Sequence, residues 1–448
     1  MRTRQMENNI GNIFKGDKVI WIIFLLLAMI SIVEVFSASS GLTYKSHNFI
    51  MPFLKHSGTV VLGFFAILVT MNVPCRYFKL LTPILLVVSV VLLILVLFIG
   101  NKTGDASRQF YVLGLSVQPS EIAKGTLVLA TAQILSALQT ENGVSDKAFR
   151  YILFITVPIA MLIMVENLST AVLLCFVILL MMIIGGVPWK QTGKLIAVVA
   201  TIAVAGVAFI MIVGEDTPTE DEASDTAVTA QIEEPKAESG LARVFHRAGT
   251  WKARILRFTR DEDIAPEDYD LDKDAQVAHA NIAIVSSNYI GKGPGNSEER
   301  DFLAQAFSDF IYAIIIEELG MGGAALVVLL YVLLLFRTAA IAGRCENSFP
   351  AFLAMGLALL LVVQAAFNMC VAVGIVPVTG QPLPLISKGG SSTVLNCIYI
   401  GMILSVSRTS VQRVPTRKAP VEEGTDDMAE SADSNTVSQH AATLPQEA

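Results

Sequence analysis

The feature that most restricts how this chain can fold is a set of long apolar runs without charge. Residues Leu80–Gly100 and Leu195–Gly214 contain no charged side chain. A helix of about 20 apolar residues crosses the ~30 Å hydrocarbon layer of a membrane. In lipid, only helices and closed barrels satisfy every backbone polar group, and these runs are far longer than barrel strands. The sequence therefore predicts an all-α, polytopic helical membrane protein.

Apolar runs separated by charged breaks predict about ten transmembrane spans. Over the whole chain 53% of residues are hydrophobic and 16% are charged, whereas soluble domains carry roughly a quarter charged residues. The span at 120–138 is the least apolar, because it contains Lys124. The spans are predicted at 19–38, 57–73, 80–100, 120–138, 151–165, 168–187, 195–214, 309–336, 349–373 and 385–406.

Basic residues predict the orientation of these spans. With the N-terminus in the cytoplasm, sixteen Lys and Arg residues fall on inner segments and five on short outer loops, as the positive-inside rule requires. The expected parts are a cytoplasmic N-terminus (1–18), seven spans (19–214), a large periplasmic loop (215–308), three spans (309–407) and a disordered cytoplasmic tail (408–448).

The large loop has two halves of different composition. Residues 215–240 are acidic and poor in large apolar side chains, which is typical of disorder. Residues 241–258 alternate basic side chains, among them Arg254, with aromatic and aliphatic ones. This pattern favours an amphipathic helix on the membrane surface over an ordinary solvated helix, because the loop is tethered to the bilayer at both ends.

Polar residues are expensive inside a membrane, so they mark candidate functional positions. Two of four polar clusters lie at 118–124 and 166–170. In the first, Ser120 is a candidate N-cap, and Glu121 and Lys124 lie on one helical face and can pair. An ordering ion pair and an anion-binding role for Lys124 are both open. In the second, Asn and Ser are ordinary turn residues, so a structural role is preferred.

The other two clusters open the eighth and tenth spans. Asp309 begins the eighth, and a carboxylate there can be a plain helix cap. Glu317 and Glu318 should lie about 12–14 Å deeper along a straight helix, and at least one must face a polar cavity. The fourth cluster, 381–396, holds Lys388 beside a Gly-Gly-Ser-Ser segment, which suits tight helix packing or the binding of a phosphate or sugar. All four clusters are expected at the outer face.

In order and spacing, these clusters resemble the SEDS family of peptidoglycan polymerases, from about the first span to Arg408. Gln118-Pro119-Ser120-Glu121 with Lys124 is similar to the family's QPSE-x-x-K motif. The segment from Asp309 to Gly320 is similar to the segment that carries the family's essential aspartate. The last third is most specific: Gln364, Asn368, Leu383-Pro384 and Gly389-Gly390-Ser391-Ser392. Asn167 and Lys388 depart from the usual aspartate and aromatic residue, and residues 303–308 depart from the usual Leu-Pro-Glu-x-His-Thr. Gly295-Asn296-Ser297 and the long tail favour a division-type member.

The resemblance implies an inverting glycosyltransferase that polymerises lipid II (undecaprenyl-pyrophosphate-linked disaccharide-peptide) on the outer face of the inner membrane, at the division septum. Asp309 is then the expected general base. Candidate cations for the pyrophosphate are Lys124, Arg254, Lys292 and Lys388, with a divalent cation (Mg²⁺ or Mn²⁺) able to assist and no organic cofactor. Further expected substrate contacts are Gln118, Ser120, Glu121, Glu318, Ser391 and Ser392.

The expected partners are a class B penicillin-binding transpeptidase and division regulators, and no nucleic acid. Two alternatives remain open. One is a transporter that flips lipid II across the bilayer, although polar residues gathered at one face favour catalysis. The other is an elongation-type polymerase that maintains cell shape.

Overall fold

The computed structural model describes residues 15–44, 50–99, 101–103, 106–112, 115–140, 143–213, 271–303 and 307–411. The acidic segment 215–240, the amphipathic segment 241–258 with Arg254, and the tail from 412 lie outside the described residues. The predictions made for them stay predictions.

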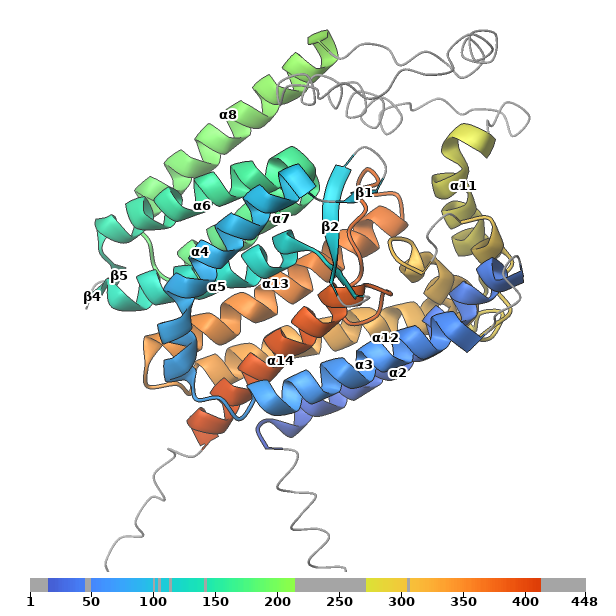
Figure 1. Cartoon of the computed structure of the whole chain (residues 1–448), viewed down its shortest axis with the longest axis horizontal. Coiled ribbons are helices and arrows are strands. Elements are labelled where there is room, and N and C mark those ends of the chain that lie inside the picture. Colours follow the sequence, from blue (N-terminus) through green and yellow to red (C-terminus); the bar gives the residue numbers. More distant parts are fainter. Residues whose placement is uncertain are drawn as a thin grey trace, which may run out of the picture. The chain divides into compact units, whose positions relative to one another are not determined.

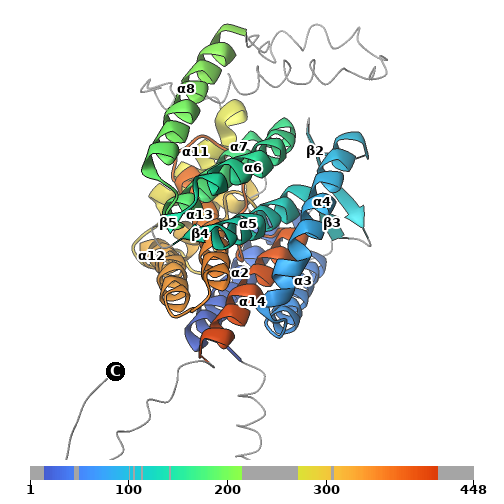
Figure 2. The ribbon, with the colours of Figure 1, turned by 90° about the vertical axis from the view of Figure 1, so that its left-hand side faces the viewer.

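Within the described residues, a helix covers all or most of each of the ten predicted spans (Figures 1 and 2). They are α2 (Lys18–Tyr44), α3 (Ile50–Thr70), α4 (Cys75–Ile99), α5 (Pro119–Ala137), α6 (Asp146–Glu166), α7 (Leu168–Ile184), α8 (Trp189–Val213), α12 (Ile311–Ala342), α13 (Ser348–Ala372) and α14 (Gly390–Val411). Seven of these, α2, α3, α4, α6, α12, α13 and α14, are long and apolar enough to cross a membrane. The chain is thus a multi-span membrane protein.

The helices differ in how much of their surface other helices cover. Helix α13 packs against α12, α5, α7 and α14, and α14 packs against α3. Helix α4 instead exposes Leu80, Ile84, Val87 and Val91, which recur at helical spacing along one face. An exposed apolar stripe of this kind faces lipid in a membrane protein, so α13 is a central helix and α4 a peripheral one.

Short strands occupy two of the connections. Strands β1 (Asn101–Thr103), β2 (Ala106–Val112) and β3 (Leu115–Val117) form an antiparallel sheet between α4 and α5. Strands β4 (Gln139–Thr140) and β5 (Gly143–Val144) form a hairpin before α6. The remaining described elements are α11 (Leu271–Ser286) and the 3₁₀ turn η1 (Glu299–Asp301), which belong to the large loop.

Three helix starts differ from the prediction. In helix α5 the N-cap position is Gln118 rather than Ser120, because Pro119 takes the first helical position, and the Gln118 side chain makes no capping hydrogen bond. Helix α12 begins at Ile311, two residues after Asp309. Helix α14 begins at Gly390 rather than 385, because Leu385 has a left-handed backbone (φ 66°) that interrupts a helix.

Helix α12 is sharply bent at Gly320, whose backbone (φ 69°, ψ −174°) is not helical. The Tyr312 hydroxyl reaches the Ala324 carbonyl at 3.4 Å. Twelve residues of straight helix span about 18 Å, well beyond the reach of a tyrosine side chain, so segment 311–319 returns toward the part after the bend. Glu317 and Glu318 lie before the bend, in the helical segment that follows Asp309, so their expected distance of about 12–14 Å along that segment stays a prediction.

Candidate active site

Asp309 lies in a turn whose backbone is held by the segment between α13 and α14. Three consecutive carbonyls accept hydrogen bonds from that side of the molecule. Phe307 O accepts from Lys388 N at 2.9 Å, and Ser308 O from the Ser387 hydroxyl at 2.6 Å. Asp309 O accepts from Asn368 Nδ2 on α13 at 2.8 Å. The third and fourth polar clusters, which lie about 75 residues apart in sequence, therefore meet at Asp309.

The side chain of Asp309 accepts a hydrogen bond from the neighbouring Ser308 hydroxyl at 2.9 Å. Lys388 lies nearby, with its ammonium 4.6 Å from the centroid of the Phe307 ring. Burial, and then the charge of Lys55, lower the pKa of Lys388. No carboxylate in the described part of the chain pairs with Lys388. Its positive charge therefore has no carboxylate partner among these residues, and it lies on the loop that holds the turn at Asp309.

The loop that carries Lys388 is tied down at several points. Ser387 Oγ accepts from Leu383 N at 2.8 Å, Ile386 O accepts from the Ser31 hydroxyl of α2 at 2.6 Å, and Pro384 O accepts from the Tyr331 hydroxyl of α12. A buried loop must satisfy its backbone in this way. Residues 381–389 are therefore a rigid support for the turn at Asp309.

Lys124 is fully buried and has two partners. Its ammonium lies 2.8 Å from Glu121 Oε1 and donates to Gln364 Oε1 at 2.7 Å. The predicted pairing of Glu121 with Lys124 is thus present. Because the pair is buried, removing either charge would leave the other uncompensated. The geometry supports an ordering ion pair and leaves the anion-binding role of Lys124 as a prediction.

Two amides on α13 join these clusters, and the prediction of site residues missed them. Gln364 accepts from Lys124 and donates to Pro382 O at 3.1 Å. Asn368, one turn further, donates to Asp309 O and to Gln381 O at 2.7 Å. Their sequence signal was available: two amides four residues apart on an apolar span occupy one helical face and are costly in lipid unless they are used.

The second cluster joins the same network. Asn167 caps α7 by accepting from Thr170 N at 3.1 Å, as expected of a turn residue. The Thr170 hydroxyl accepts from Gln381 Nε2 at 2.6 Å. The segment 166–170 thus supports the loop that holds Asp309.

The first and fourth clusters also touch directly. Gln118 N donates to the Ser391 hydroxyl at 3.3 Å, and the Tyr399 hydroxyl of α14 donates to Glu121 O at 2.6 Å. Ser392 instead donates to Gly389 O at 2.6 Å, within its own turn. The predicted residues Gln118, Glu121 and Ser391 are therefore brought together, and Ser120 lies buried beside them.

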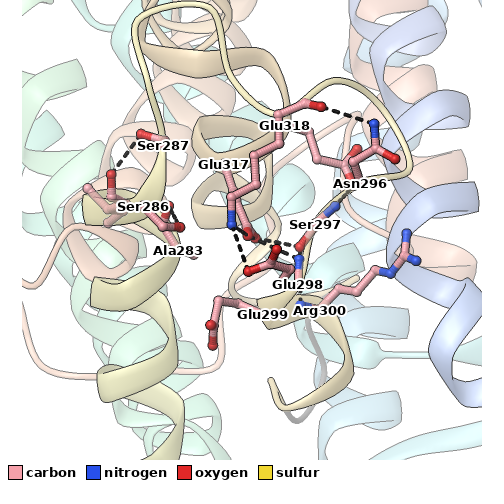
Figure 3. Close-up of polar contacts among 12 residues, drawn as sticks. Ala283, Ser286, Ser287, Asn296, Ser297, Glu298, Glu299, Arg300, Glu317 and Glu318 are labelled. Carbon is pink, nitrogen blue, oxygen red and sulfur yellow. Dashed lines mark hydrogen bonds and ion pairs between the residues drawn. The ribbon is translucent and has the colours of Figure 1, made fainter.

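Glu317 and Glu318 bind the end of the large loop rather than an open cavity (Figure 3). Lys292 Nζ lies 2.8 Å from Glu317 Oε1, which also accepts from Glu298 N at 3.0 Å. Glu318 accepts from Gly295 N at 3.0 Å and from the Ser37 hydroxyl of α2. The hydrogen bond that Lys292 donates to Glu317 is the main cause of the raised pKa of Lys292. Its charge is therefore already compensated within the protein.

The bend at Gly320 explains how this loop docks. A bend removes the helical N–H partners of the carbonyls before it. Lys292 N donates to Glu317 O at 2.9 Å, and Gly293 N donates to Glu318 O at 2.8 Å. Gly291, Gly293 and Gly295 all have positive φ, which lets the loop follow the helix closely. The glycine run is thus a docking segment.

A match to a protein-family model decides the family. Residues 17–412 match the model FTSW_RODA_SPOVE, described as "Cell cycle protein". The chain belongs to the FtsW/RodA/SpoVE family. The match covers the whole site, from α2 to α14.

Named relatives of this FtsW/RodA/SpoVE chain are similar over nearly their full length. It is 30% identical over 390 residues to the probable peptidoglycan glycosyltransferase FtsW of Halomonas elongata, covering 85% of this chain and 88% of that relative. It is 29% identical over 398 residues to the corresponding protein of Coxiella burnetii, covering 86% and 95%. It is 26% identical over 392 residues to the peptidoglycan glycosyltransferase MrdB of Escherichia coli, covering 87% and 93%.

Solved structures share the fold. A chain from a peptidoglycan synthase complex, solved to explain how polymerisation and crosslinking are coordinated, has a TM-score of 0.63 at 23% identity and covers 89% of this chain and 99% of that one. The rod shape determining protein RodA of Thermus thermophilus has a TM-score of 0.59 at 22% identity, covering 89% and 98%. The predicted helical membrane fold is confirmed.

Within the described residues, no group of three or more His, Cys, Asp or Glu side chains could hold the expected divalent cation. Mg²⁺ is commonly held by one or two carboxylates together with substrate phosphates. Metal assistance stays a prediction.

Proposed function

We propose that this chain is a peptidoglycan glycosyltransferase that polymerises lipid II during cell division. Relatives named as peptidoglycan glycosyltransferases match it over nearly their whole length. The observation that carries the proposal is the turn at Asp309, whose three consecutive carbonyls are each held by α13 or by the loop before α14. A carboxylate held on so constrained a backbone supports a role for Asp309 in proton transfer.

Asp309 acts as the general base in this proposal. It takes the proton from the acceptor sugar hydroxyl while that oxygen attacks the anomeric carbon of the donor sugar. The bond from that carbon to the lipid diphosphate breaks, the diphosphate leaves with the electron pair, and the anomeric configuration inverts. The proton stays on the Asp309 carboxyl until solvent removes it. General-base assistance contributes about 10²–10⁴-fold.

Cations must stabilise the diphosphate that leaves. Among the three candidates that lie in the described residues, the structure supports Lys388 most, since no carboxylate there pairs with it and its loop holds the turn at Asp309. Lys124 and Lys292 already pair with Glu121 and Glu317. Either would have to exchange that partner to bind a phosphate.

The cellular setting is part of the same proposal. The basic residues on alternate connections favour cytoplasmic termini and a site on the outer face of the inner membrane. The similarity to proteins named FtsW favours the division septum. The likeness to a chain from a peptidoglycan synthase complex supports a class B penicillin-binding transpeptidase as partner. Division regulators would bind the assembled pair.

The first test compares Asp309→Asn with Asp301→Asn in purified protein bound to its transpeptidase, using fluorescent lipid II. Asp301 is a matched control, because it lies in the same loop region and, within the described residues, forms an ion pair only with its neighbour Arg300, at 3.8 Å. We expect strand synthesis to fall about 10²–10⁴-fold for Asp309→Asn and to stay near normal for Asp301→Asn. Strand synthesis by Asp309→Asn within a few-fold of the parent would refute the base assignment.

The flippase alternative is separated by a second assay on the same variants. Lipid II translocation is measured in proteoliposomes with a reagent that reacts only at the exposed leaflet. A polymerase should lose strand synthesis in Asp309→Asn with no matching change in translocation. Loss of translocation with strand synthesis retained would favour the transporter.

A further inference from the structure

We infer that Asn368 is a positioning residue for Asp309. Its side-chain amide holds the backbone of the proposed base against the loop that carries Lys388. This inference rests on the proposed function, because it gives Asn368 a role only if Asp309 performs the proton transfer.

Both N–H groups of the Asn368 amide are used, and each binds a different segment. One donates to Asp309 O at 2.8 Å and the other to Gln381 O at 2.7 Å. The side chain is almost fully buried on α13, which packs against α12, α5, α7 and α14. One amide thus links the turn before α12 to the loop before α14 from a central helix.

The chemistry of the position requires an amide in this orientation. Two carbonyl oxygens converge on it, so only a group with two donors satisfies both. A flipped amide would set Oδ1 against both oxygens, which fixes the assignment of its N and O atoms. Aspartate would present oxygen to both carbonyls, and leucine would present none of the required donors while keeping a similar volume.

The bond to Asp309 is the one that matters for turnover. Gln364, one turn away on the same face, also holds the loop through Pro382 O, so the loop keeps an anchor on α13 when Asn368 is replaced. The turn at Asp309 loses the hydrogen bond that Asn368 donates to it from α13. Proton transfer is sensitive to displacements of about 1 Å, so a loosened turn should slow chemistry more than substrate binding.

The test compares Asn368→Leu with Thr338→Val in the complex with the transpeptidase, using fluorescent lipid II. Thr338 is a matched control: it is buried on α12 and donates one hydrogen bond, to Leu334 O at 2.8 Å. For Asn368→Leu we expect kcat to fall about tenfold or more and KM to stay within about threefold. The acidic limb of the pH–rate profile should move. Asn368→Gln keeps both donors on a longer chain and should recover part of the loss.

Several results would overturn the inference. One is a kcat for Asn368→Leu within about twofold of the parent. Another is a loss of activity that a raised KM explains. A third is a loss of kcat that accompanies a larger fall in melting temperature than Thr338→Val shows. A lowered rate with an unmoved pH profile would mean a purely structural role. If Asn368→Leu does not assemble, Asn368→Ser is read in the same way. If Asp309→Asn is inactive while Asn368→Leu is normal, this inference fails alone; if Asp309→Asn is active, the proposed function fails first.

Discussion

Two lysines, one fully buried and one half-buried, show that residue type alone does not tell whether a charge has a counter-ion in the fold. Lys124 and Lys388 were both predicted as cations for a diphosphate. Lys124 is matched by Glu121 at 2.8 Å, whereas Lys388 lies over the Phe307 ring and feels the like charge of Lys55. A charge without a counter-ion in a region of low dielectric attracts an anion strongly. At the residue scale, Lys388 is therefore the stronger candidate for the leaving group.

The shifted pKa of Lys388 predicts an early loss of activity at high pH. Burial, and then repulsion from Lys55, hold this pKa below its usual value of 10.5. The ammonium therefore loses its proton at a lower pH than an exposed lysine, and kcat/KM should fall as pH rises through that lowered value. Lys388→Arg keeps its charge at any accessible pH and should move the alkaline limb upward. Lys55→Ala should do so to a lesser degree, because it removes only the like charge.

The measurement is kcat/KM for lipid II against pH for the three proteins. Lys79→Ala, on α4, serves as the control for removing a lysine charge elsewhere. Identical alkaline limbs in the parent and in both variants would exclude Lys388 from the charge balance of the reaction.

At the scale of the element, the bend of α12 is the decisive feature. Gly320 lets segment 311–319 return toward the bundle, and the freed carbonyls of Glu317 and Glu318 bind the glycine run of the large loop. The same two residues bind that run through their carboxylates. The loop and the turn at Asp309 are thus attached to opposite ends of one short helical segment.

Gly320→Ala should therefore damage both stability and turnover. The conformation at Gly320 is nearly exclusive to glycine, and an added Cβ would meet the backbone of Tyr289 and Ile290. Such strain costs about 1–3 kcal/mol. We expect a melting temperature several degrees lower and slower strand synthesis.

Gly322→Ala is the matched control, two residues along the same helix. Its added Cβ would lie 3.9 Å from Tyr289 O, an ordinary contact. Its stability should equal or exceed that of the parent, since alanine favours helix by about 0.5–1 kcal/mol. Equal melting temperatures for the two variants would show that the bend is not a constraint on the fold.

At the scale of the whole molecule, α2 and α12 are tied together at two levels. Asp17 pairs with Arg337 at 2.6 Å, and the Ser37 hydroxyl donates to Glu318. The two ties are about 30 Å apart along α2, which matches the thickness of the hydrocarbon layer. Polar ties at both boundaries fix the depth of these helices without placing charge in the middle of the membrane.

Acid should weaken the tie at Asp17. Burial by itself would raise the pKa of Asp17, but its hydrogen bond and charge interaction with Arg337 outweigh burial and lower the pKa below 3.8. A lowered folded-state pKa gives stability that is present above the unfolded value and is lost as pH falls through the folded value. The parent should therefore be more stable than Asp17→Asn at pH 7, and this advantage should begin to fall near the unfolded pKa of about 4 and be lost as pH drops through the lowered folded-state pKa. The stability difference is measured by thermal unfolding of the parent and Asp17→Asn in detergent from pH 7 to low pH, with Asp146→Asn as the control. An advantage that persists at low pH would contradict the ion-pair account.

The sequence by itself determined the fold class and nearly every helix. Charge-free runs of membrane length permit only helices in lipid, and the ten predicted spans correspond to ten helices in the described residues. The pairing of Glu121 with Lys124 also followed from their spacing, because residues three apart share a helical face. These are local properties, since they depend on residues close together in the chain.

Only the tertiary structure decided how the polar clusters work together. Asn368, Ser387 and Lys388 reach the turn at Asp309 from 59 to 79 residues away, and no periodicity specifies such contacts. The sequence pattern also did not predict the bend at Gly320, because the apolar run continues across it. The unusual backbone conformation of this glycine becomes necessary only where the loop docks. Hydropathy reports which side chains leave water; it does not report which buried donor meets which carbonyl, and that pairing is what holds Asp309 in place.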